Sequence, residues 1–286
     1  MEIKDFIRSK WGSTDPERFP GPQPVSIERK HFKLLTRNRY LVCEKTDGTR
    51  HFLISFMIGN KKVCALVDRL FSYTLYNGIT VPKDTLLDGE LLGDTFIVHD
   101  AVCIGGKDLK KMNLLERLDA ARDMIRKVVP VTHLTIYLKK MVPLSEIRQV
   151  RQDYTTDGLI FTPIDEPIRM GTHLTLFKWK PLEKITIDFW VTKQRDFYIQ
   201  DQYICGPMKI NQTECIAECC YRDGHWELVK IRKDKIHPNN KRTYERTMRN
   251  IEENIKIKEF CSLVPLILHD VDTKNVDRSS RDDSAV

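Results

Sequence analysis

A lysine, an aspartate and a glycine stand close together in the stretch EKTDGTR, residues 44–50, between two runs with the composition of β-strands. A lysine at the junction of two strands can point into a cleft. A desolvated lysine beside other cations has a lowered pKa and becomes a nucleophile. Lys45 is therefore a candidate nucleophile, and the rest of the chain should supply a site for its electrophile.

Three later segments carry groups that suit a phosphate electrophile. They are LLDGELLGD with Glu90, TTDGLIF with Asp157, and LFKWKP with Lys178 and Lys180. Alternation along a strand sends residues 178 and 180 to the same face, where two ammonium groups can clamp one phosphate. The carboxylates can hold Mg²⁺ or ribose hydroxyls. Each pattern alone is weak, because a DG pair is usually a turn and a K-x-K is usually a solvated face. Their order along the chain is the informative part.

A mixed set of elements must position these groups. Short β-rich runs separated by turns extend from residue 40 to residue 103 and predict an antiparallel sheet. A helix is predicted over residues 113–129, where the apolar residues form one stripe and Asn113 can cap the first turn. Before residue 40, prolines at 16, 20, 22 and 24 exclude a continuous helix and predict a lead-in segment rather than a core element.

The pattern changes after residue 183, where several short strands spaced by turns favour a small barrel followed by a helix. The predicted fold class is therefore α+β. We expect antiparallel sheets with flanking helices in residues 1–183, a small β-barrel domain with a C-terminal helix in residues 184–270, and a polar, disordered tail in residues 271–286.

The composition limits the function classes. The net charge of +7 and the pI of about 8.9 favour a phosphate-bearing partner. The longest apolar runs fall well short of the ~20 residues that a membrane-spanning helix needs, so no membrane span is expected. The N-terminus lacks the pattern of a secretory signal, and we expect the eight cysteines to be reduced thiols.

Six motifs then point to a known superfamily. In chain order they are KTDG at 45–48, DGE at 88–90, HDAV at 99–102, DGLIF at 157–161, LFKWKP at 176–181 and RKDK at 232–235. The set resembles that of the covalent nucleotidyltransferases, which comprise the mRNA capping guanylyltransferases and the ATP-dependent polynucleotide ligases. Three segments are more similar to the capping guanylyltransferases than to the ligases: FPGPQPVSIERKHF at 19–32, KWKP, and DKIHPN at 234–239. The resemblance runs from about residue 19 to about residue 260, nearly the whole chain.

The resemblance implies a two-step reaction and a fold of a nucleotidyltransferase domain followed by an OB-fold lid. Lys45 would attack the α-phosphate of GTP, expel pyrophosphate and hold GMP as a phosphoramidate. The 5′-diphosphate end of an RNA would then take the GMP and form a 5′–5′ triphosphate cap. Catalysis of this kind comes mainly from positioning and from neutralising charge on the phosphate oxygens.

The resemblance also implies roles for other residues of the nucleotidyltransferase domain. Lys178 and Lys180 would clamp the α-phosphate, and Asp157 would carry Mg²⁺ or Mn²⁺. Glu90 would bind the ribose, and Arg50 would reach the ribose or a phosphate.

The base and the leaving group have their own candidates. His99 stands where the family commonly has an aromatic side chain stacked on the base, and it could also donate a hydrogen bond or be a core residue. Lys139 is similar to a family lysine that reads the guanine edge, although its neighbour Lys140 leaves the register open. If strand alternation turns Lys139 inward together with Tyr137 and Thr135, Lys140 faces away. In the lid, three residues would orient the pyrophosphate. These are Arg232, Asp234 and Lys235.

Two other functions stay open on the sequence. The first is an ATP-dependent polynucleotide ligase, in which Lys45 would carry AMP; Glu44 before it is similar to ligases, whereas KWKP and the opening segment are not. The second is a catalytically silent nucleic-acid-binding protein with a basic OB-fold.

The resemblance implies partners as well. The chain contains no His-Cys dipeptide, which a cysteine-phosphatase type of triphosphatase would need, and shows no methyltransferase Gly-rich loop. We therefore expect a separate RNA 5′-triphosphatase, a separate cap methyltransferase and the transcription machinery as partners. The expected location is the nucleus for a cellular protein, and the host cytoplasm or nucleus for a viral one.

Overall fold

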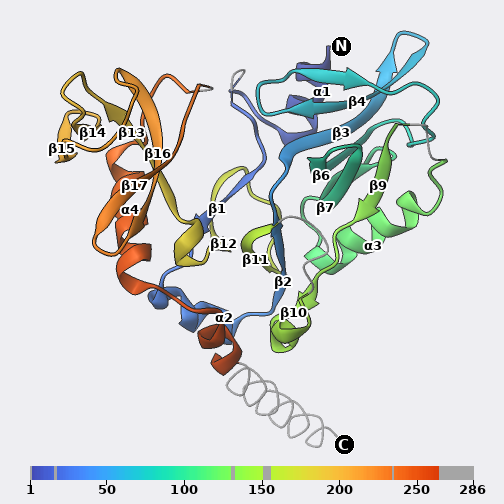
Figure 1. Ribbon diagram of the computed structural model, residues 1–286. Coiled ribbons are helices and arrows are strands. Elements are labelled where there is room, and N and C mark those ends of the chain that lie inside the picture. The colour runs from blue at the N-terminus through green and yellow to red at the C-terminus, as the bar shows by residue number, and fades with distance from the viewer. Residues whose placement is uncertain (1, 16–17, 130–132, 151–155, 234, 264–286) are drawn as a thin grey trace, which may run out of the picture. The chain divides into compact units, whose positions relative to one another are not determined.

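The computed structural model describes residues 2–15, 18–129, 133–150, 156–233 and 235–263 (Figure 1). The chain forms two compact units. Unit 1 contains residues up to 25 together with 34–178, and unit 2 contains 26–33 together with 179–263. The predicted boundary after residue 183 stays a prediction, and the predicted tail of residues 271–286 lies outside the described residues.

Unit 1 contains two sheets. The larger one has seven strands in the order β5-β4-β3-β6-β7-β8, with β9 paired in parallel to β7. Its strands are β3 (Thr49–Ile58), β4 (Lys61–Asp68), β5 (Tyr73–Leu75), β6 (Thr85–Leu92), β7 (Thr95–Ile104), β8 (Lys107–Asp108) and β9 (Thr135–Leu138). All its other pairings are antiparallel, as the runs between residues 40 and 103 predict.

The second sheet has five strands in the order β1-β12-β11-β2-β10. They are β1 (Pro22–Ser26), β2 (Tyr40–Thr46), β10 (Val142–Pro143), β11 (Thr156–Pro163) and β12 (Gly171–Trp179). Because β2 belongs to this sheet and β3 to the larger one, the turn between them, which contains Asp47 and Gly48, joins the two sheets. This junction is where the sequence places the candidate nucleophile.

Three helices lie wholly or partly in the described part of unit 1. They are α1 (Ile3–Trp11), the short α2 (Phe32–Arg37, which begins in unit 2) and α3 (Leu114–Ile125). Short 3₁₀ turns occur at Leu144–Gln149 in unit 1 and at Arg29–His31 in unit 2. The helix predicted over 113–129 is present as α3 but ends at Ile125, and the Asn113 side chain accepts a hydrogen bond from the Glu116 backbone N–H at 3.0 Å. Figure 1 shows α3 beside β7 and β9.

The opening segment is part of the core, so its prediction as a lead-in outside the core is wrong. The ring of Phe6 in α1 stacks on Phe56 with centroids 4.5 Å apart. Phe19, among the prolines, stacks on Phe52 at 4.1 Å. Proline excludes a helix interior but not an edge strand or a buried turn, and β1 is such an edge strand, paired with β12.

Unit 2 is a five-stranded antiparallel sheet in the order β15-β14-β13-β16-β17. Its elements are a 3₁₀ turn (Leu182–Lys184), β13 (Thr186–Val191), β14 (Phe197–Ile199), β15 (Gln202–Cys205), β16 (Cys215–Arg222), β17 (His225–Ile231) and α4 (Lys241–Glu253). Its first strand pairs with its second and fourth, the connectivity of a partly open OB-type barrel. The fold is thus α+β with antiparallel sheets, as predicted, and all eight cysteines are free thiols.

Candidate active site

A cavity of about 170 Å³ in unit 1 gathers five of the residues that the sequence singles out. They are Lys45, Arg50, Glu90, His99 and Lys139. Sheet register explains how segments so far apart meet. Strands β3 and β6 pair with Arg50 opposite Glu90, and β6 pairs with β7, which carries His99.

Lys45 forms an ion pair with a carboxylate on the neighbouring strand β11. Its Nζ lies 2.9 Å from Oδ1 of Asp157, and the two side chains are 25% and 15% exposed. The pairing of β2 with β11 shifts register between Thr156 and Leu159, and Asp157 lies in that bulge. A bulge re-aims the side chains of its strand, which accounts for an aspartate directed at a lysine on the neighbouring strand.

The glycines of KTDG and DGE are required by close backbone approach. A Cβ on Gly48 would lie 2.6 Å from the carbonyl oxygen of Leu91 and 2.9 Å from Cγ of Glu90. A Cβ on Gly89 would lie 2.5 Å from the Phe96 ring. Such distances are shorter than van der Waals contact, so a side chain at either position would push β6 and Glu90 out of place.

Arg50 forms an ion pair with the buried Asp88. Its Nε donates to Asp88 at 2.9 Å, its Nη1 donates to the Pro22 carbonyl at 2.5 Å, and the side chains of Arg50 and Asp88 are 8% and 1% exposed. Nε2 of His99 lies 3.3 Å from the same carboxylate. Burial by itself raises the pKa of Asp88, but the charge of Arg50 and then His99 outweighs it and holds that pKa far below its ordinary range. Arg50 and His99 are therefore held by Asp88 at the cavity wall.

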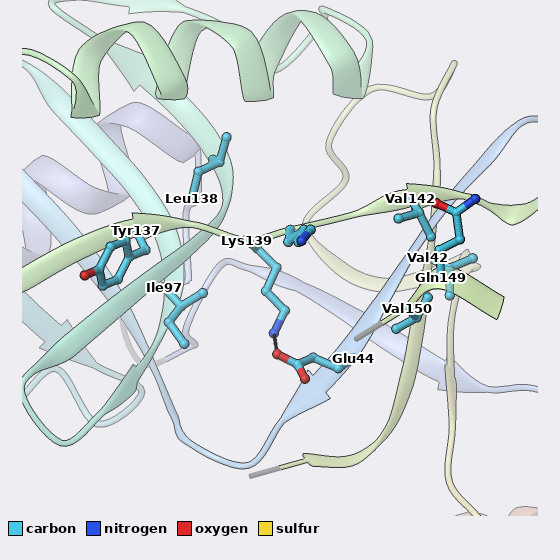
Figure 2. A pocket seen from close by; sticks show the side chains of 10 residues that line it. Val42, Glu44, Ile97, Tyr137, Leu138, Lys139, Val142, Gln149 and Val150 are labelled. Atoms are coloured by element: carbon cyan, nitrogen blue, oxygen red, sulfur yellow. Dashed lines mark hydrogen bonds and ion pairs between the residues drawn. The ribbon is translucent and has the colours of Figure 1, made fainter. Parts of the chain in front are cut away.

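Lys139 forms the second buried ion pair of the cavity. Its Nζ lies 2.8 Å from Oε1 of Glu44, and it also donates to the Thr46 hydroxyl. Figure 2 shows the two side chains pointing toward one another beside a second cavity of about 130 Å³, which they also line. Lys139 is buried and Lys140 exposed. Tyr137 is 52% exposed, so its predicted inward direction is wrong.

The alternation argument fails here because β9 ends at Leu138, one residue before Lys139. Thr135, also predicted to turn inward, is exposed as well. The period of two applies only within a strand.

Sequence reasoning missed three residues of the cavity region. Glu44 precedes the candidate nucleophile, Asp88 is the aspartate of the DGE motif, and Arg69 lines the cavity after β4. Burial first, and then the charge of Arg50, lowers the pKa of Arg69. A charged residue inside an apolar strand, such as Asp88 in LLDGELL, was the available signal, because a buried charge needs a partner.

The remaining candidates lie elsewhere. Lys178 is the last residue of unit 1 and Lys180 the second residue of the following part of unit 2, and neither is among the residues that line the cavity. In unit 2, Nη1 of Arg232 lies 3.2 Å from the buried Asp188, which Lys235 also contacts. Asp234 lies outside the described residues.

A divalent metal fits the site only if a substrate shares it. No group of three or more His, Cys, Asp or Glu side chains could hold a metal ion among the described residues. Asp157 offers a single carboxylate beside Lys45. Mg²⁺ is commonly bound by one or two carboxylates together with substrate phosphates, so Asp157 suits a metal that arrives with a nucleotide.

Two antiparallel sheets that meet at a cleft lysine, followed by an OB-type domain, define the nucleotidyltransferase class. Family models place the chain within that class: the catalytic domain of the mRNA capping enzyme matches residues 2–182, and its C-terminal domain matches residues 174–261. The chain belongs to the mRNA capping enzyme family.

Two relatives, both named as subunit alpha of the mRNA-capping enzyme, agree with this placement. The chain is 27% identical to the mRNA-capping enzyme subunit alpha of Schizosaccharomyces pombe, over 95% of this chain and 88% of the relative. It is 30% identical to the protein of the same name from Eremothecium gossypii, over 93% of this chain and 82% of the relative. A solved structure titled "Pmar-Lig_Pre." aligns with 79% of this chain and 58% of its own at a TM-score of 0.48 and 13% identity.

No helix among the described residues is long and apolar enough to cross a membrane.

Proposed function

We propose that this protein is an mRNA guanylyltransferase that transfers GMP from GTP to the 5′-diphosphate end of RNA through a covalent bond to Lys45. The observation that carries the proposal is the Lys45–Asp157 pair beside a cavity that Lys45 lines, in a chain matched by the capping enzyme family from residue 2 to residue 261. The family match supports the reaction, and the position of Lys45 beside Asp157 supports its choice as the nucleophile.

In the first step the ammonium of Lys45 loses a proton to solvent, and the resulting amine forms a bond to the α-phosphorus of GTP and releases a second proton to solvent. The bond from that phosphorus to the bridging oxygen breaks, and pyrophosphate leaves. Asp157, at 2.9 Å, orients the amine toward the cleft. A divalent metal bound to Asp157 would neutralise part of the negative charge on the phosphate. In the second step an oxygen of the RNA diphosphate takes the GMP and Lys45 is released.

The other residues take supporting roles in this proposal. Glu90 binds the ribose, His99 packs on the base, and Lys139 donates to the guanine O6. Lys178 and Lys180 neutralise the α-phosphate. Arg50 reaches the ribose or a phosphate of the nucleotide. Because it also bonds to Asp88, it fixes the cavity wall that carries Glu90. In unit 2, Arg232 and Lys235 would release Asp188 and bind the leaving pyrophosphate. Asp234 would help to orient it.

A labelling experiment tests the proposal. The purified protein is incubated with Mg²⁺ and α-labelled GTP, in parallel with α-labelled ATP, and wild type and Lys45→Ala are compared on denaturing gels. We expect covalent label from GTP that added pyrophosphate removes and that Lys45→Ala lacks. Label from ATP would make the protein a ligase. A folded protein that takes no label from either nucleotide would be a binding module instead.

The proposal extends to partners and location. A guanylyltransferase acts on RNA ends that a 5′-triphosphatase has produced, and its product goes to a cap methyltransferase. We propose both as separate partner proteins, with the transcription machinery delivering the RNA in the nucleus.

A further inference from the structure

The carboxylate of Glu44 is buried, and only one of its two oxygens has a hydrogen-bond partner among the described residues. Its side chain is 5% exposed, and Oε1 accepts the ammonium of Lys139 at 2.8 Å. Its other oxygen, Oε2, is buried and has no hydrogen-bond partner among the described residues. A buried, unsatisfied carboxylate oxygen is costly and requires an explanation.

The surroundings of Glu44 suggest a ligand. Glu44 lines the same cavity as Lys45 and His99, so a nucleotide placed for attack by Lys45 would bring its base toward this carboxylate. Lys139 and Glu44 together present a fixed pair, an ammonium donor beside a carboxylate acceptor. The Thr46 hydroxyl also contacts Lys139 and keeps the ammonium in place.

Guanine carries the complementary pattern along one edge: an acceptor at O6 followed by donors at N1–H and N2–H₂. With O6 on the ammonium, the two donor groups face the carboxylate. Adenine in the same orientation would set its 6-amino group against the ammonium and the lone pair of N1 against the carboxylate. A site that leaves buried polar groups unpaired rejects the wrong ligand strongly.

We propose that Glu44 is a specificity-determining residue that accepts the N1–H and N2–H₂ donors of guanine at Oε2, with Lys139 on O6. This inference rests on the proposed function, because it assumes that a nucleotide base enters the cavity. It gives the pair two tasks: Lys139 reads the 6-oxo group, and Glu44 reads the 2-amino group.

The test compares GTP with ITP, which has the 6-oxo group and N1–H but lacks the 2-amino group. The rate of covalent labelling at subsaturating nucleotide is measured for the wild-type full chain and for Glu44→Gln. In the variant the amide oxygen must face the Lys139 ammonium, because an amide N–H₂ cannot accept from it. The amide nitrogen then turns a donor toward the 2-amino group.

We expect the wild type to prefer GTP over ITP by about tenfold or more, the size of one lost hydrogen bond to a charged group. In Glu44→Gln that preference should fall to near unity or reverse. The ratio is taken within each protein, so a loss of active protein in the variant cancels. Glu28→Gln is the matched control, since Glu28 is equally buried at 6% exposed but lies in unit 2, and it should keep the wild-type ratio.

Each outcome decides the inference. Equal labelling of the wild type by GTP and ITP would overturn it without any variant. A Glu44→Gln protein whose labelling falls equally with both nucleotides would show that Glu44 only positions Lys139. Absence of label from GTP in the wild type would overturn the proposed function itself, which is a different result from a changed ratio.

Discussion

The buried Arg50–Asp88 pair makes a sharp prediction about stability. In Asp88→Asn the guanidinium of Arg50, 8% exposed, would keep its burial and lose its counter-charge. Breaking a buried pair by removing one partner costs about 3–5 kcal/mol. Since whole domains are stable by about 5–15 kcal/mol, this one change should remove a large share of the stability of unit 1.

Hydrogen exchange of the β3 and β6 amides is the suitable assay, because these strands carry the pair and report on unit 1 alone. A loss of 3–5 kcal/mol corresponds to exchange faster by between about 10² and 10⁴-fold. Asp165→Asn is the control: its partner Arg39 lies 3.0 Å away, but the side chains are 62% and 55% exposed, so we expect a cost of at most about 1 kcal/mol.

The pH dependence of this pair has a definite sign. The folded pKa of Asp88 lies far below its ordinary value of 3.8, so the pair contributes its full stability above that value and loses it as the pH falls toward the folded pKa. The difference between wild type and Asp88→Asn should therefore be present at neutral pH and shrink as the pH falls below about 5. A change in exchange of less than fivefold at neutral pH would refute the reasoning.

Three further outcomes follow from the packing. Gly89→Ala should lower the thermal midpoint of unit 1 and destabilise it by about 1–3 kcal/mol, because the new Cβ would lie 2.5 Å from a phenylalanine ring; an unchanged midpoint in calorimetry would contradict this. Asp188→Asn should destabilise unit 2 by about 1–3 kcal/mol by removing the negative charge that two cations contact, measured by tryptophan fluorescence on urea unfolding, with an unshifted midpoint as the contrary result. Burial raises the pKa of the Cys43 and Cys64 thiols to about 12, so at pH 8 iodoacetamide should modify both at least about 100-fold more slowly than the partly exposed Cys261, and equal rates in peptide mass spectra would exclude that burial.

The sequence by itself determined the class of the protein and most of its local structure. Motif order made Lys45 the candidate nucleophile. The apolar stripe with its Asn113 cap predicted α3, because capping and periodicity are local properties of the chain. The α+β class and the antiparallel strands followed from turn-separated β runs in the same way.

The tertiary structure alone decided which charges meet. Asp88 pairs with Arg50, and Glu44 pairs with Lys139. The tertiary fold brings these partners together, and no local sequence pattern predicts which partner each carboxylate meets. The proline-rich opening was misjudged for the same reason, since only the assembled sheets show that Phe19 has a ring to stack on. Burial, and with it the energy of every charge in the site, is a property of the packed fold rather than of any segment.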